Sequence, residues 1–154
     1  MGRETERKFL VYDTSFKKEA SAKQEIRQGY LSTEKTHVVR LRIQDGKGFI
    51  TIKSAGAGIT RSEFEYEIPR EDAMEMMQRM CSVLIEKFRY IVWYGGMKWE
   101  VDEFLNDNEG LLLAEIELER ADQPFEKPTW ISKEVTDDKR YYNAHLINHP
   151  YKQW

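Results

Sequence analysis

Charged side chains recur at every second position along several stretches of this sequence, with neutral or apolar side chains between them. In the clearest stretch the charged residues are Arg61, Glu63, Glu65 and Glu67, and the residues between and after them are Ser62, Phe64, Tyr66 and Ile68. Successive side chains of a β-strand point to opposite faces, so this pattern predicts a strand with one charged and one neutral face. An ordinary sheet does not bury its charged side.

The same alternation predicts further strands before and after this one. They lie at 4–9, 39–43, 50–53, 87–90, 99–104 and 114–119. Arg7 is an exception, because it falls on the face of Phe9 rather than on the face of Glu4. Turn-forming residues separate the strands at 45–48, 95–96 and 106–110. We therefore expect the strands to run as an antiparallel meander.

Helical patterns are fewer. The sequence predicts helices at 15–26, 69–81, 129–135 and 140–147. A capping residue at 13–15 precedes the first of them, and Pro69 suits the first turn of the second. In that second helix, the spacing of Met74, Met77 and Cys81 predicts a stripe that faces the core.

Length and composition bound the class of protein. The chain has 154 residues, which suits one domain spanning 1–154. Its net charge of −3, without a run of basic residues, predicts neither a nucleic-acid partner nor a membrane partner. Cys81 is the single cysteine, which excludes an internal disulfide and suits a reducing compartment. No apolar stretch resembles a signal peptide or is long enough to cross a bilayer, so we expect a soluble, cytoplasmic protein.

If the neutral faces pack against helices on the outside, the charged faces must meet inside a closed sheet. The predicted fold class is therefore α+β, an antiparallel closed or nearly closed β-barrel with helices packed outside. Its interior acids would be Glu4, Glu6, Glu63, Glu65, Glu100, Asp102, Glu115 and Glu117, and its interior bases Lys8, Arg40, Arg42, Lys53, Arg61, Lys87 and Arg89. A network of buried ion pairs is the alternative interpretation, but such pairs rarely stabilise enough to explain so many charges.

The two sets of interior charges indicate different ligands. Crowded carboxylates repel one another unless cations lie between them, and oxygen ligands without His or Cys favour Mg or Mn over Zn. Rows of Arg and Lys suit phosphate oxygens, which also complete the coordination of such a metal. A linear polyphosphate satisfies both sets, and its metal-dependent hydrolysis is the simplest reaction.

Eight short motifs then resemble, in order, those of one family. They are Glu4-Thr5-Glu6-Arg7-Lys8, Gln28-Gly29-Tyr30-Leu31, Val39-Arg40-Leu41-Arg42 with Thr51-Ile52-Lys53, Arg61-Ser62-Glu63-Phe64-Glu65, Glu86-Lys87-Phe88-Arg89, Trp99-Glu100-Val101-Asp102 and Ala114-Glu115-Ile116-Glu117. They resemble the CYTH superfamily, also called the triphosphate tunnel metalloenzymes, in its short bacterial form. The resemblance implies a tunnel of about eight antiparallel strands, a size that can surround one small ligand.

The resemblance also implies roles for the interior residues. The leading metal ligands are Glu4, Glu6, Asp102, Glu115 and Glu117, with Glu63 and Glu65 contributing to a second metal or its waters. The residues implied to bind phosphate are Lys8, Arg40, Arg42, Lys53, Arg61, Lys87 and Arg89, of which Lys8, Lys87 and Arg89 are also implied to be catalytic. The segment 137–140 departs from the Gly-Asp-Pro-Arg of similar proteins, so no role is predicted for Lys139 or Arg140.

Within this resemblance, hydrolysis of inorganic tripolyphosphate to pyrophosphate and phosphate is favoured, because the compact chain leaves few loops to bind a base or thiazolium ring. The alternatives are a nucleoside or thiamine triphosphatase, a class IV adenylyl cyclase, and a non-catalytic polyphosphate- or nucleotide-binding protein. The oligomeric state is not predicted.

Several other residues are interpreted as structural. The histidines His37, His145 and His149 lack metal-ligand spacing, so we expect surface or packing roles for them. Gly56 and Gly58 are expected in a hairpin rather than in a phosphate-binding loop.

Overall fold

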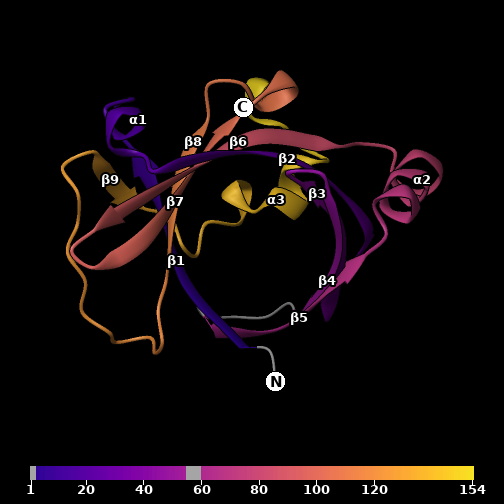
Figure 1. Cartoon of the computed structure of the whole chain (residues 1–154), viewed down its shortest axis with the longest axis horizontal. Coiled ribbons are helices and arrows are strands. Elements are labelled where there is room, and N and C mark those ends of the chain that lie inside the picture. Colours follow the sequence, from indigo (N-terminus) through magenta and orange to yellow (C-terminus); the bar gives the residue numbers. More distant parts are fainter. Residues whose placement is uncertain (1–2, 55–59) are drawn as a thin grey trace.

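The computed structural model describes residues 3–54 and 60–154. Within this part of the chain, eight antiparallel strands run around a closed barrel, which Figure 1 shows from one end. They are β1 (Arg3–Val11), β2 (Ala22–Thr33), β3 (His37–Gln44), β4 (Lys47–Ser54), β5 (Thr60–Ile68), β6 (Ile85–Tyr94), β7 (Met97–Phe104) and β8 (Leu112–Glu117). A further strand, β9 (Ile131–Glu134), pairs with the second half of β1. The predicted antiparallel barrel is confirmed.

The predicted meander is correct only in parts. Strands β2 to β5 form one run of neighbouring hairpins and β6 to β8 form another. The two runs are joined where β2 pairs with β6, and β1 closes the ring by lying between β5 and β8. A closed sheet leaves no unpaired edge along the barrel, and here the first strand supplies the closure.

Strand β1 meets three partners along its length. Its first residues pair with β5, with Glu4 opposite Arg61. From Glu6 onward it pairs with β8, so that Glu6 lies opposite Glu117 and Lys8 lies opposite Glu115. This register brings the charged alternations of distant motifs together on one inner face.

Arg7 broke the alternation because it faces outward. Its guanidinium forms a salt bridge with Glu134 of β9, and Glu134 also accepts a hydrogen bond from the hydroxyl of Thr136. The exceptional residue therefore attaches β9 to the outside of β1.

The apolar core has two parts, one outside the barrel wall and one on the inner strand faces at the end of the barrel that the C-terminal segment covers. One buried cluster joins Phe9, Trp99 and Trp130 to Phe16 in the short helix α1 (Phe16–Glu19). A second cluster lies under the C-terminal segment and includes Ile85, Phe104, Leu113 and Leu146. The wall is not covered everywhere, since Phe64 and Tyr66 on the neutral face of β5 are 40% and 59% exposed. Neutral faces thus point outward, as the sequence pattern predicted.

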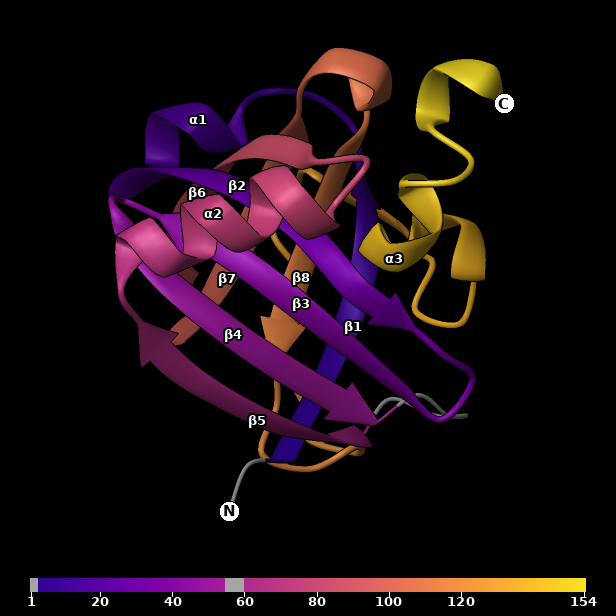
Figure 2. The ribbon, with the colours of Figure 1, turned by 90° about the vertical axis from the view of Figure 1, so that its right-hand side faces the viewer.

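Helix α2 (Arg70–Met80) confirms the prediction at 69–81, with Pro69 at its N-cap. It lies across the outer face of β3 and β4, as Figure 2 shows. The buried residues of the helix are Ala73 and Met77, whereas Met74 is 39% exposed, so the predicted stripe was wrong at Met74. Gly48 permits this approach, because a Cβ there would lie only 3.0 Å from the Cβ of Ala73.

Two helix predictions were wrong. Only the four residues of α1 are helical within 15–26, and the chain then enters β2. The segment 129–135 contains β9 instead of a helix. The helix predicted at 140–147 is present, but as two short elements rather than one helix. They are the 3₁₀ turn η2 (Lys139–Tyr141) and the helix α3 (Asn143–Leu146).

The remaining elements are two single 3₁₀ turns, η1 (Asn106–Asn108) and η3 (Tyr151–Gln153). The β3–β4 turn sits at Asp45 and Gly46, both with positive φ, as the predicted hairpin requires. Gly56 and Gly58 lie outside the described residues. None of the helices in residues 3–54 and 60–154 has the length and apolar character needed to span a membrane.

Candidate functional site

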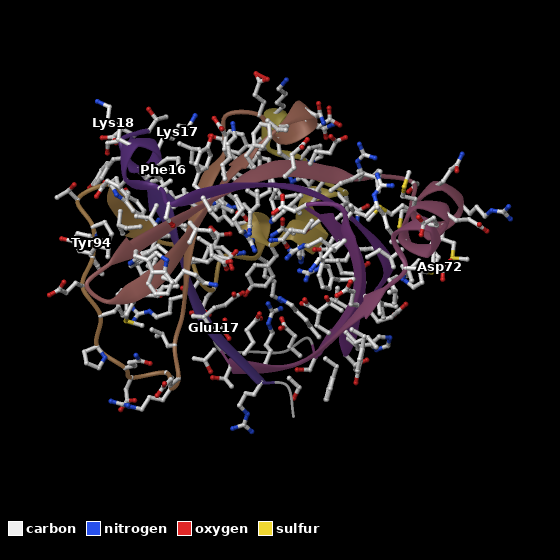
Figure 3. All side chains as sticks on the ribbon, in the orientation of Figure 1. Phe16, Lys17, Lys18, Asp72, Tyr94 and Glu117 are labelled. Carbon is white, nitrogen blue, oxygen red and sulfur yellow. The ribbon has the colours of Figure 1, made fainter. Side chains whose placement is uncertain are left out.

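A cavity of about 910 Å³ occupies the interior of the barrel. Nitrogen- and oxygen-bearing side chains fill this interior in Figure 3, while Lys17, Lys18 and Asp72 lie outside the ring. The predicted site residues that line the cavity are Glu4, Glu6, Lys8, Arg40, Arg42, Lys53, Arg61, Glu63, Glu65, Lys87, Arg89, Glu115 and Glu117. Asp102 is the predicted residue that does not line it, because it is buried behind Lys87 and Arg89.

Carboxylates from three adjacent strands gather on one side of this cavity. Glu4 and Glu6 come from β1, Glu63 comes from β5, and Glu115 and Glu117 come from β8. Because β1 lies between β5 and β8, the alternation within each strand brings all of these side chains onto neighbouring inner positions.

The crowding of these carboxylates shifts their pKa values in opposite directions. Burial and the nearby Glu115 raise the pKa of Glu6 well above its ordinary value, and Glu6 forms a hydrogen bond with Glu115. Burial likewise raises the pKa of Glu4, which forms a hydrogen bond with Glu63. Burial opposes ionisation of Glu115, but the ammonium of Lys8 and the hydrogen bond from Glu6 hold its pKa well below the ordinary value.

Such carboxylate pairs fit a hard divalent cation. Each pair brings carboxylate oxygens together, and a metal ion between them would relieve the repulsion of their charges. Within the described residues, no three Asp, Glu, His or Cys side chains converge as a ready-made metal site. The five carboxylates on these adjacent strands are therefore the groups that could hold a metal after small side-chain movements.

The walls formed by β3, β4 and β6 are cationic, and Lys8 of β1 and Arg61 of β5 place two more cations beside the carboxylates. The ammonium of Lys53 lies 3.1 Å from Glu4 and 3.2 Å from Glu63, and the ammonium of Lys8 lies 3.6 Å from Glu115. Arg61 contacts both Glu4 and Glu6, at 3.5 and 3.6 Å. These ion pairs link the carboxylate side of the cavity to its basic side.

Arg40 is the least satisfied of these cations. It donates to the hydroxyl of Thr51 at 3.1 Å and lies 3.9 Å from Glu65. Its buried Nε has no hydrogen-bond partner among the described residues. A buried donor without an acceptor costs free energy, so this guanidinium is suited to a ligand oxygen.

Lys87, Arg89 and Asp102 form a buried group at the back of the cavity. Arg89 donates through two nitrogens to the two oxygens of Asp102, at 2.8 and 2.9 Å, and Lys87 lies 2.7 Å from the same carboxylate. Burial would raise the pKa of Asp102, but Arg89 and Lys87 lower it to about 2. For Lys87 burial prevails over the attraction of Asp102 and lowers the pKa to about 7. In this structure the oxygens of Asp102 bind cations of the chain, so its role as a metal ligand stays a prediction.

The C-terminal segment also contributes to the cavity, which sequence reasoning missed. Figure 1 places α3 within the outline of the ring, and Figure 2 places it at one end of the barrel. The ammonium of Lys8 donates to the carbonyl of Tyr141 at 3.3 Å and lies 5.4 Å from the ring of Tyr142. Lys139 lines the cavity, whereas Arg140 pairs with Asp138 on the surface.

Other lining residues without an assigned role are Thr51, Thr136, Asn143 and His145. Thr136, Asn143 and His145 belong to no charged alternation, so their sequence signal was weak, whereas Thr51 shares a strand face with Lys53 but was given no chemical role. Gln28, whose side chain binds Arg42, belongs to the motif Gln28-Gly29-Tyr30-Leu31, but the sequence predicted no chemical role for it.

An antiparallel barrel with paired carboxylates facing rows of Arg and Lys defines a protein built to hold a strongly anionic ligand together with a cation. The comparisons agree with this class. The sequence model of the CYTH domain matches residues 2–145, and the chain belongs to this family.

Among its relatives, an inorganic triphosphatase of Acetivibrio thermocellus is 46% identical over 155 residues, covering 100% of this chain and 99% of the relative. An inorganic triphosphatase of Nitrosomonas europaea is 37% identical, over 93% of this chain and 95% of the relative. A solved structure of an inorganic triphosphatase is 34% identical, with a TM-score of 0.68 over 96% of this chain and 95% of that one.

Proposed function

We propose that this chain is an inorganic triphosphatase that hydrolyses tripolyphosphate to pyrophosphate and phosphate with Mg or Mn. The observation that carries the proposal is the division of one cavity of about 910 Å³ into a carboxylate side and a cationic side. A phosphate chain with a divalent ion presents both charges that such a cavity requires. The two relatives named inorganic triphosphatase support the choice of substrate. We also propose that one CYTH domain spans 1–154.

The cationic side would hold the phosphate chain. Among the described residues, Arg40 has a buried Nε without a partner and Arg42 has no carboxylate within 4.0 Å, so both can donate to phosphate oxygens without first breaking a strong ion pair. Lys53 and Arg61 would exchange carboxylate partners for phosphate. Lys8, Lys87 and Arg89 would stabilise the charge that develops as the bond between phosphates breaks.

The carboxylate side would hold the metal. The proposed ligands are Glu4, Glu6, Glu63, Glu115 and Glu117, with Glu65 and Asp102 as further ligands implied by the family resemblance. When bound, the metal would supply charge neutralisation and lower the pKa of a water molecule. The basic residues would meanwhile orient the phosphate chain toward this side of the cavity.

The test is phosphate release by the purified protein. Tripolyphosphate, ATP, thiamine triphosphate and pyrophosphate are each assayed with Mg, with Mn and with EDTA. Release from tripolyphosphate that exceeds the others and stops with EDTA is the expected result. Faster release from ATP or thiamine triphosphate would reassign the substrate, and formation of a cyclic nucleotide from ATP would indicate a cyclase. Binding without turnover of any substrate would make the protein a non-catalytic receptor.

A further inference from the structure

Two cations of the cavity are held by neutral amides. The guanidinium of Arg42 donates twice to Oε1 of Gln28, at 3.0 and 2.8 Å. The ammonium of Lys87 donates to Oδ1 of Asn143 at 3.1 Å. The two amides are themselves joined, because Nε2 of Gln28 donates to the same Oδ1 at 3.2 Å. A continuous chain of hydrogen bonds therefore runs from Arg42 through Gln28 and Asn143 to Lys87.

The chemistry of the partners fixes the orientation of both amides. Arginine and lysine side chains can only donate hydrogen bonds, so the oxygens of Gln28 and Asn143 must face them. The remaining NH₂ group of Gln28 then has an acceptor in the oxygen of Asn143. Gln28 is fully buried, so it has no solvent with which to exchange these bonds.

Arg42 differs in this respect from the neighbouring cations, whereas Lys87 has the amide of Asn143 in addition to the carboxylate of Asp102 at 2.7 Å. Lys8, Lys53, Arg61 and Arg89 each lie within 3.6 Å of at least one carboxylate oxygen. Among the described residues, Arg42 has no carboxylate partner within 4.0 Å, and an amide supplies its acceptor instead. An amide oxygen orients a cation without cancelling its charge, whereas a carboxylate does both.

We propose that Gln28 and Asn143 are positioning residues, whose amides hold Arg42 and Lys87 toward the phosphate chain without adding a negative charge beside either cation. The inference rests on the proposed function for the identity of the anion. It also gives a role to the C-terminal segment, because Asn143 is the first residue of α3 and links that helix to β2 and β6.

The decisive variant is Asn143→Asp. An aspartate has the same shape and keeps an oxygen for Lys87 and Gln28, so a merely structural role predicts unchanged or higher thermal stability and unchanged kinetics. If the amide is required because it is uncharged, the new carboxylate will compete with phosphate for the positive charge of Lys87. We expect the KM for tripolyphosphate to rise about tenfold or more, with a smaller change in kcat and no loss of melting temperature.

Two further variants complete the test. Gln28→Glu places the same extra charge against Arg42 and should also raise KM. Asn106→Asp makes the same exchange at an exposed position in η1 and should leave both kinetic constants unchanged. Gln28 is fully buried, so Gln28→Glu could destabilise the fold, and its KM is compared with wild type only if its melting temperature is unchanged. If its melting temperature falls, the test rests on Asn143→Asp alone.

Calorimetric titration with tripolyphosphate in EDTA separates this inference from the proposed function. Weaker binding to Asn143→Asp than to wild type supports the amide proposal even if the wild type hydrolyses nothing, an outcome that would refute only the proposed activity. Wild-type KM and wild-type affinity in a stable Asn143→Asp protein would overturn the amide proposal, even with hydrolysis confirmed.

Discussion

Replacing Arg42 by lysine is expected to make hydrolysis fall more steeply between pH 6 and pH 8 than it does in the wild-type protein. Burial, reinforced by the nearby charges of Arg40 and Arg89, lowers the pKa of Arg42 from 12.5 to about 9. The same surroundings would lower the pKa of a lysine at this position from its ordinary value of about 10.4 to about 7. Between pH 6 and pH 8 the charged fraction of that lysine would fall from roughly nine-tenths to one-tenth, while the arginine stays mostly charged.

The assay compares kcat/KM for tripolyphosphate in Arg42→Lys and in wild type at pH 6, 7 and 8, at constant ionic strength. The ratio of variant to wild type removes the ionisation of the substrate itself, and it should fall about tenfold across this range if only the charged lysine binds phosphate. Arg27→Lys, on the exposed outer face of β2, is the matched control and should give a constant ratio near one. A ratio for Arg42→Lys that does not change with pH would refute this prediction. It would show that the cavity does not lower the pKa of a basic side chain at position 42.

Three further outcomes are expected. Glu117→Gln should lower kcat/KM about 10- to 100-fold, with partial recovery at high Mg concentration, because the carboxylate side loses an anionic ligand. Phe9→Ala should lower the free energy of unfolding in urea by about 3–5 kcal/mol, since Phe9 is fully buried between aromatic rings. Tyr12→Ala, at a side chain 72% exposed, should change it by less than about 0.5 kcal/mol. Gly29→Ala should destabilise by about 1–3 kcal/mol, because a Cβ there would lie 2.8 Å from the Sγ of Cys81.

Each of these has a result that would contradict it. Glu75→Gln on the exposed face of α2 is the control for Glu117→Gln, and equal activity of the two variants would remove Glu117 from the metal-binding set. Equal unfolding curves for Phe9→Ala and Tyr12→Ala would show that the outer cluster does not stabilise the barrel. Because alanine normally favours a strand more than glycine does, stabilisation by Gly29→Ala would mean that the contact with Cys81 relaxes easily.

The inner face of the barrel was predictable because its charges obey a local rule. Period-two alternation needs no knowledge of partners, so Arg40 and Arg42 or Glu115 and Glu117 could be placed on one face from the sequence alone. Burial of that face also followed, since the opposite face of most strands carries the apolar residues.

Strand β2 was predicted incorrectly because it inverts this rule. Its charged residues Lys23, Glu25 and Arg27 are exposed on the outside, while neutral Gln28 is buried on the inner face against Arg42. Lys, Gln and Glu are also good helix formers, so local propensity favoured a helix. Pairing with β3 on one side and β6 on the other outweighs that propensity, and neither pairing can be read from local sequence.

The C-terminal contribution could not be predicted for a related reason. Strand β9 exists because Phe9 and Val11 of β1 offer a free edge beyond the end of β5. Asn143 reaches Lys87 only because α3 sits at one end of the barrel. Such contacts depend on where distant segments pack, and no periodicity within 129–147 encodes them.

The position of β1 between β5 and β8 has a consequence for the order in which this protein can fold. The first strand to be synthesised cannot meet β8 until roughly a hundred further residues have emerged, so barrel closure is an event of high contact order. Glu6 approaches Glu115 only at that moment, and an incompletely folded chain therefore lacks the cavity altogether. A ligand that bridges β1 and β8 would stabilise the closed barrel over every open form, so the proposed substrate and cation would also add to the stability of the folded protein.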